Sequence, residues 1–211
     1  MSTWPQVEAA LDQMLARRWY TNHGPMAQRL GAAAAASCGV RHAVVATNPT
    51  IALVMLIEAM ELSRLVLVLP EAPALCAQAV RWAGLQPVSW PLDARSSLPS
   101  GVSGLLLSGQ GDHVAATSWA TRMGLAVLRH GDAGQLVPEV VQLGGCGETA
   151  GVGCVLTGDD VLAARLRNIR SSYGAGPAVP VARTANGRVS EAQAALALLT
   201  FEARGCGVRG G

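Results

Sequence analysis

The stretch "HAVVATNPTIALVMLIEAM", His42 to Met60, sets the architecture of the chain. It opens with apolar, partly β-branched residues, as in a buried strand, and continues with an apolar run long enough for a helix. Asn48 and Pro49 separate the strand-like run from the helix-like run, and proline is common at a helix start. Together with Glu58 they break the run before it reaches the roughly 20 apolar residues of a membrane span. The stretch therefore predicts a strand, a turn and a helix.

Apolar runs and helical patterns alternate along the rest of the chain. This βαβ rhythm is typical of a mainly parallel sheet covered by helices on both faces, so we expect a three-layer α/β fold. The expected strands cover residues 42–47, 64–69, 86–90, 103–108, 125–129 and 152–157. The expected helices cover residues 5–17, 26–38, 50–61, 73–83, 113–123, 159–171 and 189–203, and Ser190 is suited to cap the last of them.

Length and composition predict a single domain. The 211 residues are 50% hydrophobic and 14% charged, and the mean hydropathy is +0.31, as in a chain with one packed core. We expect this domain to span residues 1–203, with residues 1–20 as an N-terminal helical segment. Residues 204–211 are expected to form a flexible tail.

Charge and cysteine content argue against several classes of function. A formal charge of +2 with scattered arginines gives no basic stripe for nucleic acid. The densest patch, "RLRNIR" at residues 165–170, is expected to be a solvated helix face, with a phosphate-binding track as the alternative. Five dispersed cysteines without CxxC spacing indicate reduced thiols rather than disulfides or a metal site. Without a secretory pattern or a membrane span, the protein is expected in the cytoplasm.

Several segments carry a family resemblance. They are "RRWYTNHGPMAQRL" (17–30), "GVRHAVVATNPTIAL" (39–53), "MGLAVLRHGDAGQLV" (123–137), and "VLTGDDVLAARLRNIRSSYG" (155–174) with "NGRVSEAQAALALL" (186–199). In this order and spacing they resemble the DegT/StrS family of sugar aminotransferases, fold-type I enzymes that use pyridoxal phosphate on nucleotide-linked keto sugars. The resemblance implies the large domain of that fold.

The resemblance also implies roles for single residues. Asn48 and Thr50 lie in the turn that offers backbone N–H groups to the cofactor phosphate at a helix start. Asp132 matches the aspartate that pairs with the pyridine nitrogen, and Gln135 takes the place of the family's His or Gln. Asn186 matches the asparagine that reaches the phosphate of the neighbouring subunit. A homodimer, or a heterodimer with an aminotransferase-like or pathway enzyme, and a nucleotide-sugar ligand are therefore implied.

The chain departs from the family pattern at the residue that carries the chemistry. Transamination needs a lysine to condense with the cofactor aldehyde, whereas all 16 residues of the Lys+Arg count are arginine. The lysine position falls near Gly145, and the strand that precedes it in the family is expected to be missing. Pro73 stands where the family has an aromatic residue that stacks on the ring, and Pro49 removes an N–H from the phosphate turn. The family's C-terminal small domain is also expected to be absent.

We therefore expect a degenerate sugar-aminotransferase relative that cannot perform ordinary transamination, an accessory or pseudoenzyme subunit in deoxysugar or specialised-metabolite biosynthesis. No covalently bound cofactor is expected. One alternative is cofactor-independent acid–base chemistry by Asp132, His130 or Glu148 in the cleft where the family binds its sugar nucleotide. Taken by itself, His130 is expected to be a solvated strand residue. Another alternative is noncovalent use of pyridoxamine phosphate through the phosphate turn and Asp132.

Overall fold

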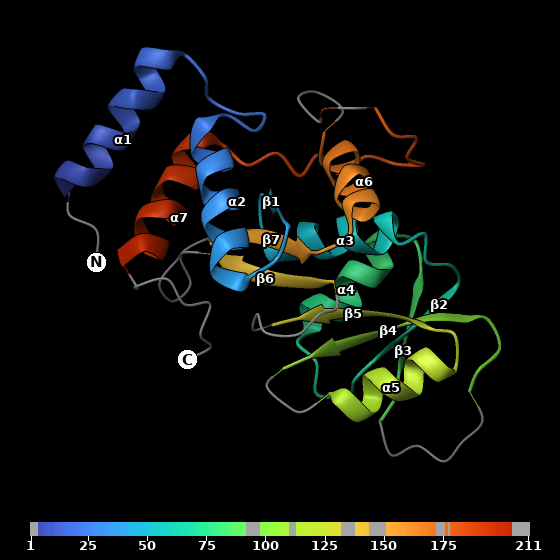
Figure 1. The fold of residues 1–211 in the computed structure, drawn as a ribbon. Coiled ribbons are helices and arrows are strands. Elements are labelled where there is room, and N and C mark those ends of the chain that lie inside the picture. Colours follow the sequence, from blue (N-terminus) through green and yellow to red (C-terminus); the bar gives the residue numbers. More distant parts are fainter. Residues whose placement is uncertain are drawn as a thin grey trace.

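A central sheet of seven strands organises the chain, and the computed structural model describes residues 4–91, 98–109, 113–131, 138–143, 151–171, 176 and 178–203 (Figure 1). The strands are β1 (His42–Ala46), β2 (Leu65–Val68), β3 (Gln86–Ser89), β4 (Val102–Ser108), β5 (Ala126–His130), β6 (Glu139–Leu143) and β7 (Val152–Thr157). The helices are α1 (Trp4–Arg17), α2 (Pro25–Cys38), α3 (Pro49–Ala59), α4 (Ala74–Trp82), α5 (Val114–Arg122), α6 (Asp160–Arg170) and α7 (Glu191–Ala203).

The strands follow the order β1-β7-β6-β5-β4-β2-β3 across the sheet. Neighbours from β6 to β3 are parallel, whereas β7 runs antiparallel to both β6 and β1. β1 therefore points the same way as the other five strands. Consequently the carboxyl ends of β1, β4, β5 and β6 share one edge of the sheet, which is where open α/β sheets place their binding sites.

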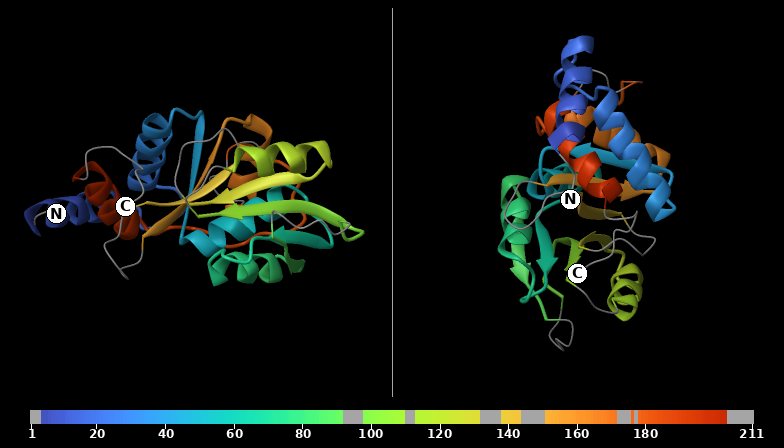
Figure 2. Two further views of the ribbon diagram at one scale, coloured as in Figure 1. Left: turned by 90° about the horizontal axis from the view of Figure 1, so that it is seen from below. Right: turned by 90° about the vertical axis from the view of Figure 1, so that its left-hand side faces the viewer.

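Helices cover both faces of the sheet, as the edge-on view in Figure 2 shows. On one face α3, α4 and α6 enclose a core that includes Leu53, Leu106 and Leu128. On the other face α2 and α7 pack around Leu30 over β1 and β7, while α5 packs around Leu105 over β4. The predicted three-layer α/β fold is confirmed.

Helix α3 forms the centre of the first face. Residues from Ala52 to Ile57 are all buried, so the helix is apolar on every side, as expected where it contacts the sheet as well as α4 and α6. Pro49 takes the first helical position, and Asn48 before it has the extended backbone (φ −160°, ψ 168°) that a following proline favours. The strand, turn and helix predicted from His42 onward are confirmed.

Strand β6 is the main departure from the expected elements. It lies between β5 and β7, so the expectation that this strand would be missing is wrong. The sequence hides it because Glu139 and Gln142 interrupt a short apolar run. Glu139 is nevertheless buried, with 2% of its surface exposed. Pairing with Arg129 of β5 and with Leu156 of β7 defines the strand, and these long-range contacts leave no local pattern.

A carboxylate from the far end of the chain fastens α2 to α7. Glu191 is buried, and its side-chain oxygens accept hydrogen bonds from the backbone N–H groups of Met26 at 2.7 Å and Ala27 at 3.2 Å. These groups belong to the first turn of α2, which the helix itself cannot satisfy. Ser190 Oγ accepts from the N–H of Gln193 at 3.1 Å, which confirms Ser190 as the predicted cap of α7.

Helix α1 lies at one end of the molecule against α7 (Figure 1). Ala10 is its buried residue, whereas Trp4 and Leu15 are 71% and 55% exposed. Within the described part of the chain, no helix combines the length and the apolar character needed to cross a bilayer.

Candidate functional site

Two of the predicted cofactor residues, Asn48 and Thr50, lie where β1 gives way to α3. Asn48 is the N-cap of α3, and its Oδ1 accepts a hydrogen bond from the N–H of Ile51 at 2.9 Å. Pro49 has no N–H to offer. At this helix start the N–H of Ile51 is therefore already bonded within the turn, and Pro49 supplies none. Fewer free backbone N–H groups are left to bind an anion.

The same turn is tied tightly to two distant segments. The N–H of Thr47 donates to the carbonyl of Gly187 at 3.1 Å, and Nε2 of Gln193 donates to the carbonyl of Thr47 at 2.8 Å. From the other side β7 presses on the turn, because a Cβ added to Gly153 would lie 2.3 Å from the carbonyl oxygen of Asn48. The turn is thus fixed by α7, its preceding loop and the β7 backbone together.

The predicted residues Asp132 and Gln135 lie outside the described residues, as does Glu148. Strand β5, which leads toward Asp132, ends at His130 at the carboxyl edge of the sheet. Across the ranges that the structure describes, no group of three or more His, Cys, Asp or Glu side chains is placed to hold a metal ion.

His130 is not the solvated strand residue that its sequence position predicts. It is half-buried, and its Nδ1 lies 3.3 Å from Oγ of Ser108, at the matching end of the neighbouring strand β4. Burial lowers the pKa of His130. Burial also raises the pKa of Cys76, a buried thiol that hydrogen-bonds to Ser108. The prediction failed because His130 lies on the same face of β5 as the buried Leu128, and α3, α4 and α6 cover that face.

Asn186 stands at the outer surface. Its backbone is left-handed (φ 46°), and its exposed side chain accepts a hydrogen bond from Nε of Arg188 at 2.9 Å. Arg188 also donates to Oδ1 of Asn22 at 3.2 Å. The next residue, Gly187, is buried and donates its N–H to the carbonyl of Arg170 at 3.1 Å. A rigid backbone therefore presents Asn186 outward, next to the loop that precedes α2.

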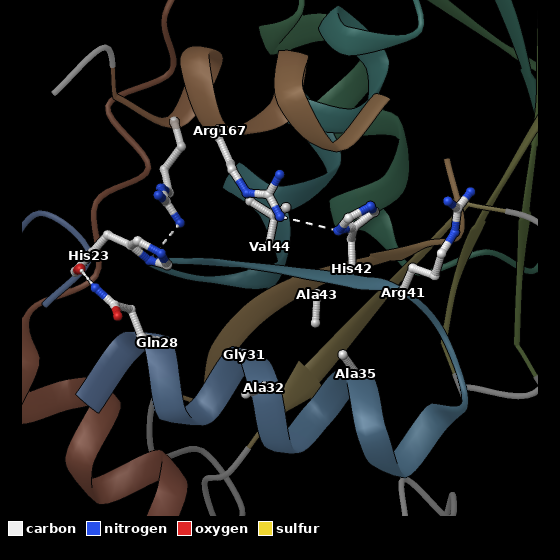
Figure 3. Close-up of a pocket in the computed structure, with 11 residues that line it drawn as sticks. His23, Gln28, Gly31, Ala32, Ala35, Arg41, His42, Ala43, Val44 and Arg167 are labelled. Carbon is white, nitrogen blue, oxygen red and sulfur yellow. Dashed lines mark hydrogen bonds between the residues drawn. The ribbon is translucent and has the colours of Figure 1, made fainter. Parts of the chain in front are cut away.

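A basic pocket lies along β1, between α2 and α6 (Figure 3), at a patch for which the sequence offered a phosphate-binding track only as the alternative. Its volume is about 190 Å³, and its basic lining residues are His23, Arg41, His42, Arg167 and Arg170. Two of these belong to the "RLRNIR" patch, for which a solvated face was expected. That expectation is wrong: Arg170 is only 3% exposed. The neighbouring apolar positions 166 and 169 carry the signal for burial, because they share one side of α6.

His23 and Arg170 make a contact that fixes the protonation of the imidazole. Nη1 of Arg170 lies 3.3 Å from Nδ1 of His23, and since a guanidinium only donates, this nitrogen accepts. Burial, followed by the charges of Arg170 and Arg167, lowers the pKa of His23 from 6.5 to about 4. The folded chain therefore binds fewer protons than the unfolded chain between these two values, and its stability falls as the pH drops through that window.

A His23→Asn variant should lose this pH dependence. Asparagine tolerates the left-handed backbone of residue 23 (φ 58°) and still offers an acceptor to Arg170, but it does not titrate. Urea unfolding of both proteins from about pH 7 to about pH 5 measures the effect. We expect the wild-type midpoint to fall more steeply than that of the variant. Equal slopes would contradict the assigned proton balance.

Comparison with known proteins connects this geometry to a family. Residues 5–100 match the sequence model of the DegT/DnrJ/EryC1/StrS aminotransferase family. A dTDP-4-amino-4,6-dideoxy-D-glucose transaminase of Escherichia coli is 32% identical over 78 residues, which are 37% of this chain and 21% of that enzyme.

The fold of this chain matches those of several solved structures over nearly its whole length. DesI, solved in the presence of its TDP-sugar product, superposes with a TM-score of 0.82 at 25% identity over 96% of this chain and 59% of DesI. NtdA of Bacillus subtilis, solved with bound PMP, shares the fold with a TM-score of 0.80 at 15% identity over 94% of this chain and 52% of NtdA. The chain thus spans about three fifths of the length of DesI. Residues 5–100 thus match the DegT/DnrJ/EryC1/StrS aminotransferase family, and nearly the whole chain shares the fold of DesI and NtdA.

Proposed function

We propose that this chain is a non-transaminating accessory subunit that works beside a lysine-bearing relative. The observation that carries the proposal is the absence of lysine, because all 16 residues of the Lys+Arg count are arginine. Among protein side chains, lysine supplies the primary amine that anchors pyridoxal phosphate and moves protons in ordinary transamination. Without it, the protein has lost the covalent route of its relatives.

The phosphate turn supports the same conclusion. Of the first three residues of α3, Pro49 has no N–H and Ile51 donates its N–H to Asn48. Thr50 is left as the backbone donor at this helix start, whereas an anion at a helix N-terminus is normally held by several such groups. The residues present do not fit a cofactor held by a lysine and a backbone phosphate cradle together.

The surface around Asn186 supports a partner. Asn186, Arg188 and Asn22 form a connected hydrogen-bonded group, and Trp19 and Tyr20, just before Asn22, are 44% and 50% exposed. Exposed aromatic and arginine side chains are enriched at protein interfaces. We call these five residues the loop surface. In the proposed complex the loop surface faces the partner and Asn186 reaches the partner's cofactor phosphate.

The biosynthetic setting of the proposal comes from the relatives. The E. coli relative is named for a dTDP-linked amino sugar, and DesI was solved with a TDP-sugar product. A nucleotide-linked sugar is common to both, and we extend that shared feature to the pathway of this chain. The partner would accordingly act on a nucleotide-linked sugar, in deoxysugar or related specialised-metabolite biosynthesis.

Co-expression with a lysine-bearing aminotransferase from the same host tests the proposal. Native mass spectrometry should show a heteromeric complex. In that complex Asn186→Ala should lower the partner's kcat/KM about tenfold, the loss expected for one hydrogen bond to a charged phosphate. Gln78→Ala serves as the matched control, because Gln78 is an exposed amide on α4, away from the loop surface.

Two results would contradict the accessory role. One is a homomeric protein that transaminates dTDP-4-amino-4,6-dideoxy-D-glucose with a 2-oxo acid when supplied only with pyridoxal phosphate. The other is a heteromeric complex whose activity is equally insensitive to Asn186→Ala and Gln78→Ala.

The contact between His130 and Ser108 favours a second candidate, which is cofactor-independent acid–base chemistry in the old cleft. Because burial lowers its pKa, His130 is neutral near neutral pH and able to accept a proton. Ser108 lies within 3.3 Å of its ring. Turnover of a nucleotide sugar by the chain alone, without cofactor, and its loss in His130→Gln, would favour this candidate over the accessory role.

A further inference from the structure

The basic pocket along β1 lies apart from the cofactor turn. It begins at Arg41 and His42, at the amino end of β1, whereas the turn follows the carboxyl end of the same strand. Its walls are α2, including Gly31 and Ala35, and the arginine-bearing side of α6 (Figure 3). A volume of about 190 Å³ is below the roughly 300 to 1,000 Å³ of sites for drug-sized ligands. The pocket therefore suits a small ion or a single ionised group.

The positive charge of this pocket is only partly balanced within the described residues, because Arg41 alone of its three arginines pairs with a described carboxylate, that of Asp160. Arg41, Arg167 and Arg170 line it, and no aspartate or glutamate is among the described lining residues. Neither Arg167 nor Arg170 takes part in an ion pair with a described carboxylate. Two guanidinium groups thus share one small pocket without a counter-ion from this part of the protein.

Arg170 makes the imbalance costly. It is 3% exposed, and its Nη2 is buried with no hydrogen-bond partner among the described residues. Burial and the charge of Arg167 lower its pKa to about 10, so the group stays positive near neutral pH. Arg170 donates through Nη1 to His23 but has no carboxylate beside it in the described part of the chain, and a buried charge without an opposite charge destabilises the folded state. A bound anion would supply that opposite charge.

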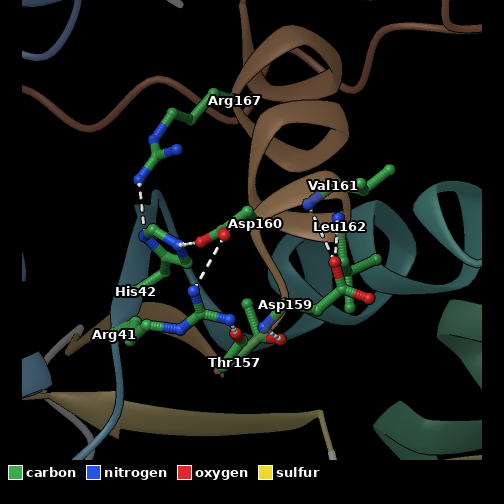
Figure 4. Close-up of polar contacts among 9 residues, drawn as sticks. Arg41, His42, Thr157, Asp159, Asp160, Val161, Leu162 and Arg167 are labelled. Carbon is green, nitrogen blue, oxygen red and sulfur yellow. Dashed lines mark hydrogen bonds and ion pairs between the residues drawn. The ribbon is translucent and has the colours of Figure 1, made fainter.

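A hydrogen-bonded chain orients the outer arginines (Figure 4). Nη2 of Arg167 donates to Nδ1 of His42 at 3.2 Å, so the other ring nitrogen of His42 carries the proton and donates to Asp160 at 2.6 Å. Arg41 pairs with the same carboxylate at 2.8 Å and also donates to the carbonyl of Gly158. Asp160 thereby holds Arg41 and, through His42, Arg167 in fixed positions, although it does not itself line the pocket.

We propose that this pocket is a binding site for a phosphate group, contacted by Arg167 and Arg41 and held in the field of Arg170. Arginine suits this role because its fixed fork of donors matches phosphate oxygens. The basic "RLRNIR" segment of α6 then carries a phosphate site on the side of the helix that faces β1. The site is independent of the proposed accessory role, because it shares no residue with the loop surface.

Calorimetric titration of the full 211-residue protein with inorganic phosphate, against chloride of equal ionic strength, tests the site. We expect a Kd of about 1 mM and roughly tenfold weaker binding in Arg167→Gln, which removes a charged donor from the pocket. Arg165→Gln is the matched control. Arg165 lies on the same helix but pairs with Glu61 at 2.9 Å and does not line the pocket. It should bind phosphate as wild type does.

A second variant and a second ligand complete the test. Arg41 is exposed, so Arg41→Gln is expected to fold even if Arg167→Gln does not. Because Arg41 lines the pocket, its loss should weaken phosphate binding. Titration with dTDP identifies the source of the phosphate group. If dTDP binds more tightly than phosphate, and the pocket variants weaken both ligands in the same order, the site belongs to a phosphorylated metabolite. If dTDP binds equally or more weakly, the site belongs to the free ion. No phosphate binding beyond chloride, or equal losses in Arg165→Gln and the pocket variants, would overturn the proposal.

Discussion

Replacing Glu191 by alanine is expected to lower the free energy of unfolding by about 3 kcal/mol. The side chain is 1% exposed and accepts hydrogen bonds from two N–H groups at the start of α2, those of Met26 and Ala27. The variant leaves both donors buried and unsatisfied, and each such loss costs about 1 to 3 kcal/mol. The carboxylate also interacts favourably with the positive end of the α2 dipole. Urea unfolding at neutral pH measures the change.

Two further variants separate this cap from general effects on α7. Glu191→Gln keeps the size and one acceptor oxygen, so about half of the loss is expected, roughly 1.5 kcal/mol. Glu202→Ala, on the same helix, removes an exposed ion pair with Arg29 at 3.7 Å, and a change within about 0.5 kcal/mol is expected. If Glu191→Ala were no more destabilising than Glu202→Ala, the capping role would be refuted.

A Gly153→Ala substitution is expected to cost about 3 kcal/mol, at the upper end of the range for overpacked cores. The new Cβ would meet three backbone atoms: the carbonyl oxygen of Asn48 at 2.3 Å, its carbonyl carbon at 2.5 Å and the nitrogen of Pro49 at 2.7 Å. Backbone atoms at a capped helix start cannot rotate away as a side chain does. Either β7 or the turn before α3 has to move. Differential scanning calorimetry should show a large fall in Tm.

Gly158→Ala is the matched control for this substitution. Gly158 follows β7 directly, and a Cβ added there would meet nothing within 4 Å. Its effect on stability is expected to stay within about 0.5 kcal/mol. Comparable losses at both glycines would show that the packing of β7 against the turn is looser than the structure indicates.

The sequence predicted well where local pattern and tertiary structure agree. The segment from His42 to Met60 contains its own strand, breaker and apolar helix, and all three appear in place. Ser190 likewise caps α7 through a contact three residues away. Such features depend on neighbours along the chain, so a single sequence is enough to infer them.

The failures share a different cause, which is contact between distant segments. Strand β6 was missed because its charged Glu139 is buried by tertiary packing. Arg170 was taken for a solvated residue, although α2, β1 and the loop at His23 enclose it. The contact of His130 with Ser108 joins two strands and could not be inferred from either alone. The structure describes the positions of Asn48, Thr50 and Asn186 but not those of Asp132 and Gln135, and the cofactor roles of all five remain predictions.

The pairing of β1 bears on how the chain folds. Among the described strands, the first strand in the sequence pairs with β7, the last, from His42 opposite Thr157 to Ala46 opposite Gly153. During synthesis the nascent β1 and the apolar helix α3 emerge long before their partner. Closing such a long loop is entropically unfavourable and slows folding. Until β7 is synthesised and pairs with β1, the apolar surface of β1 and α3 is therefore open to chaperones or to aggregation.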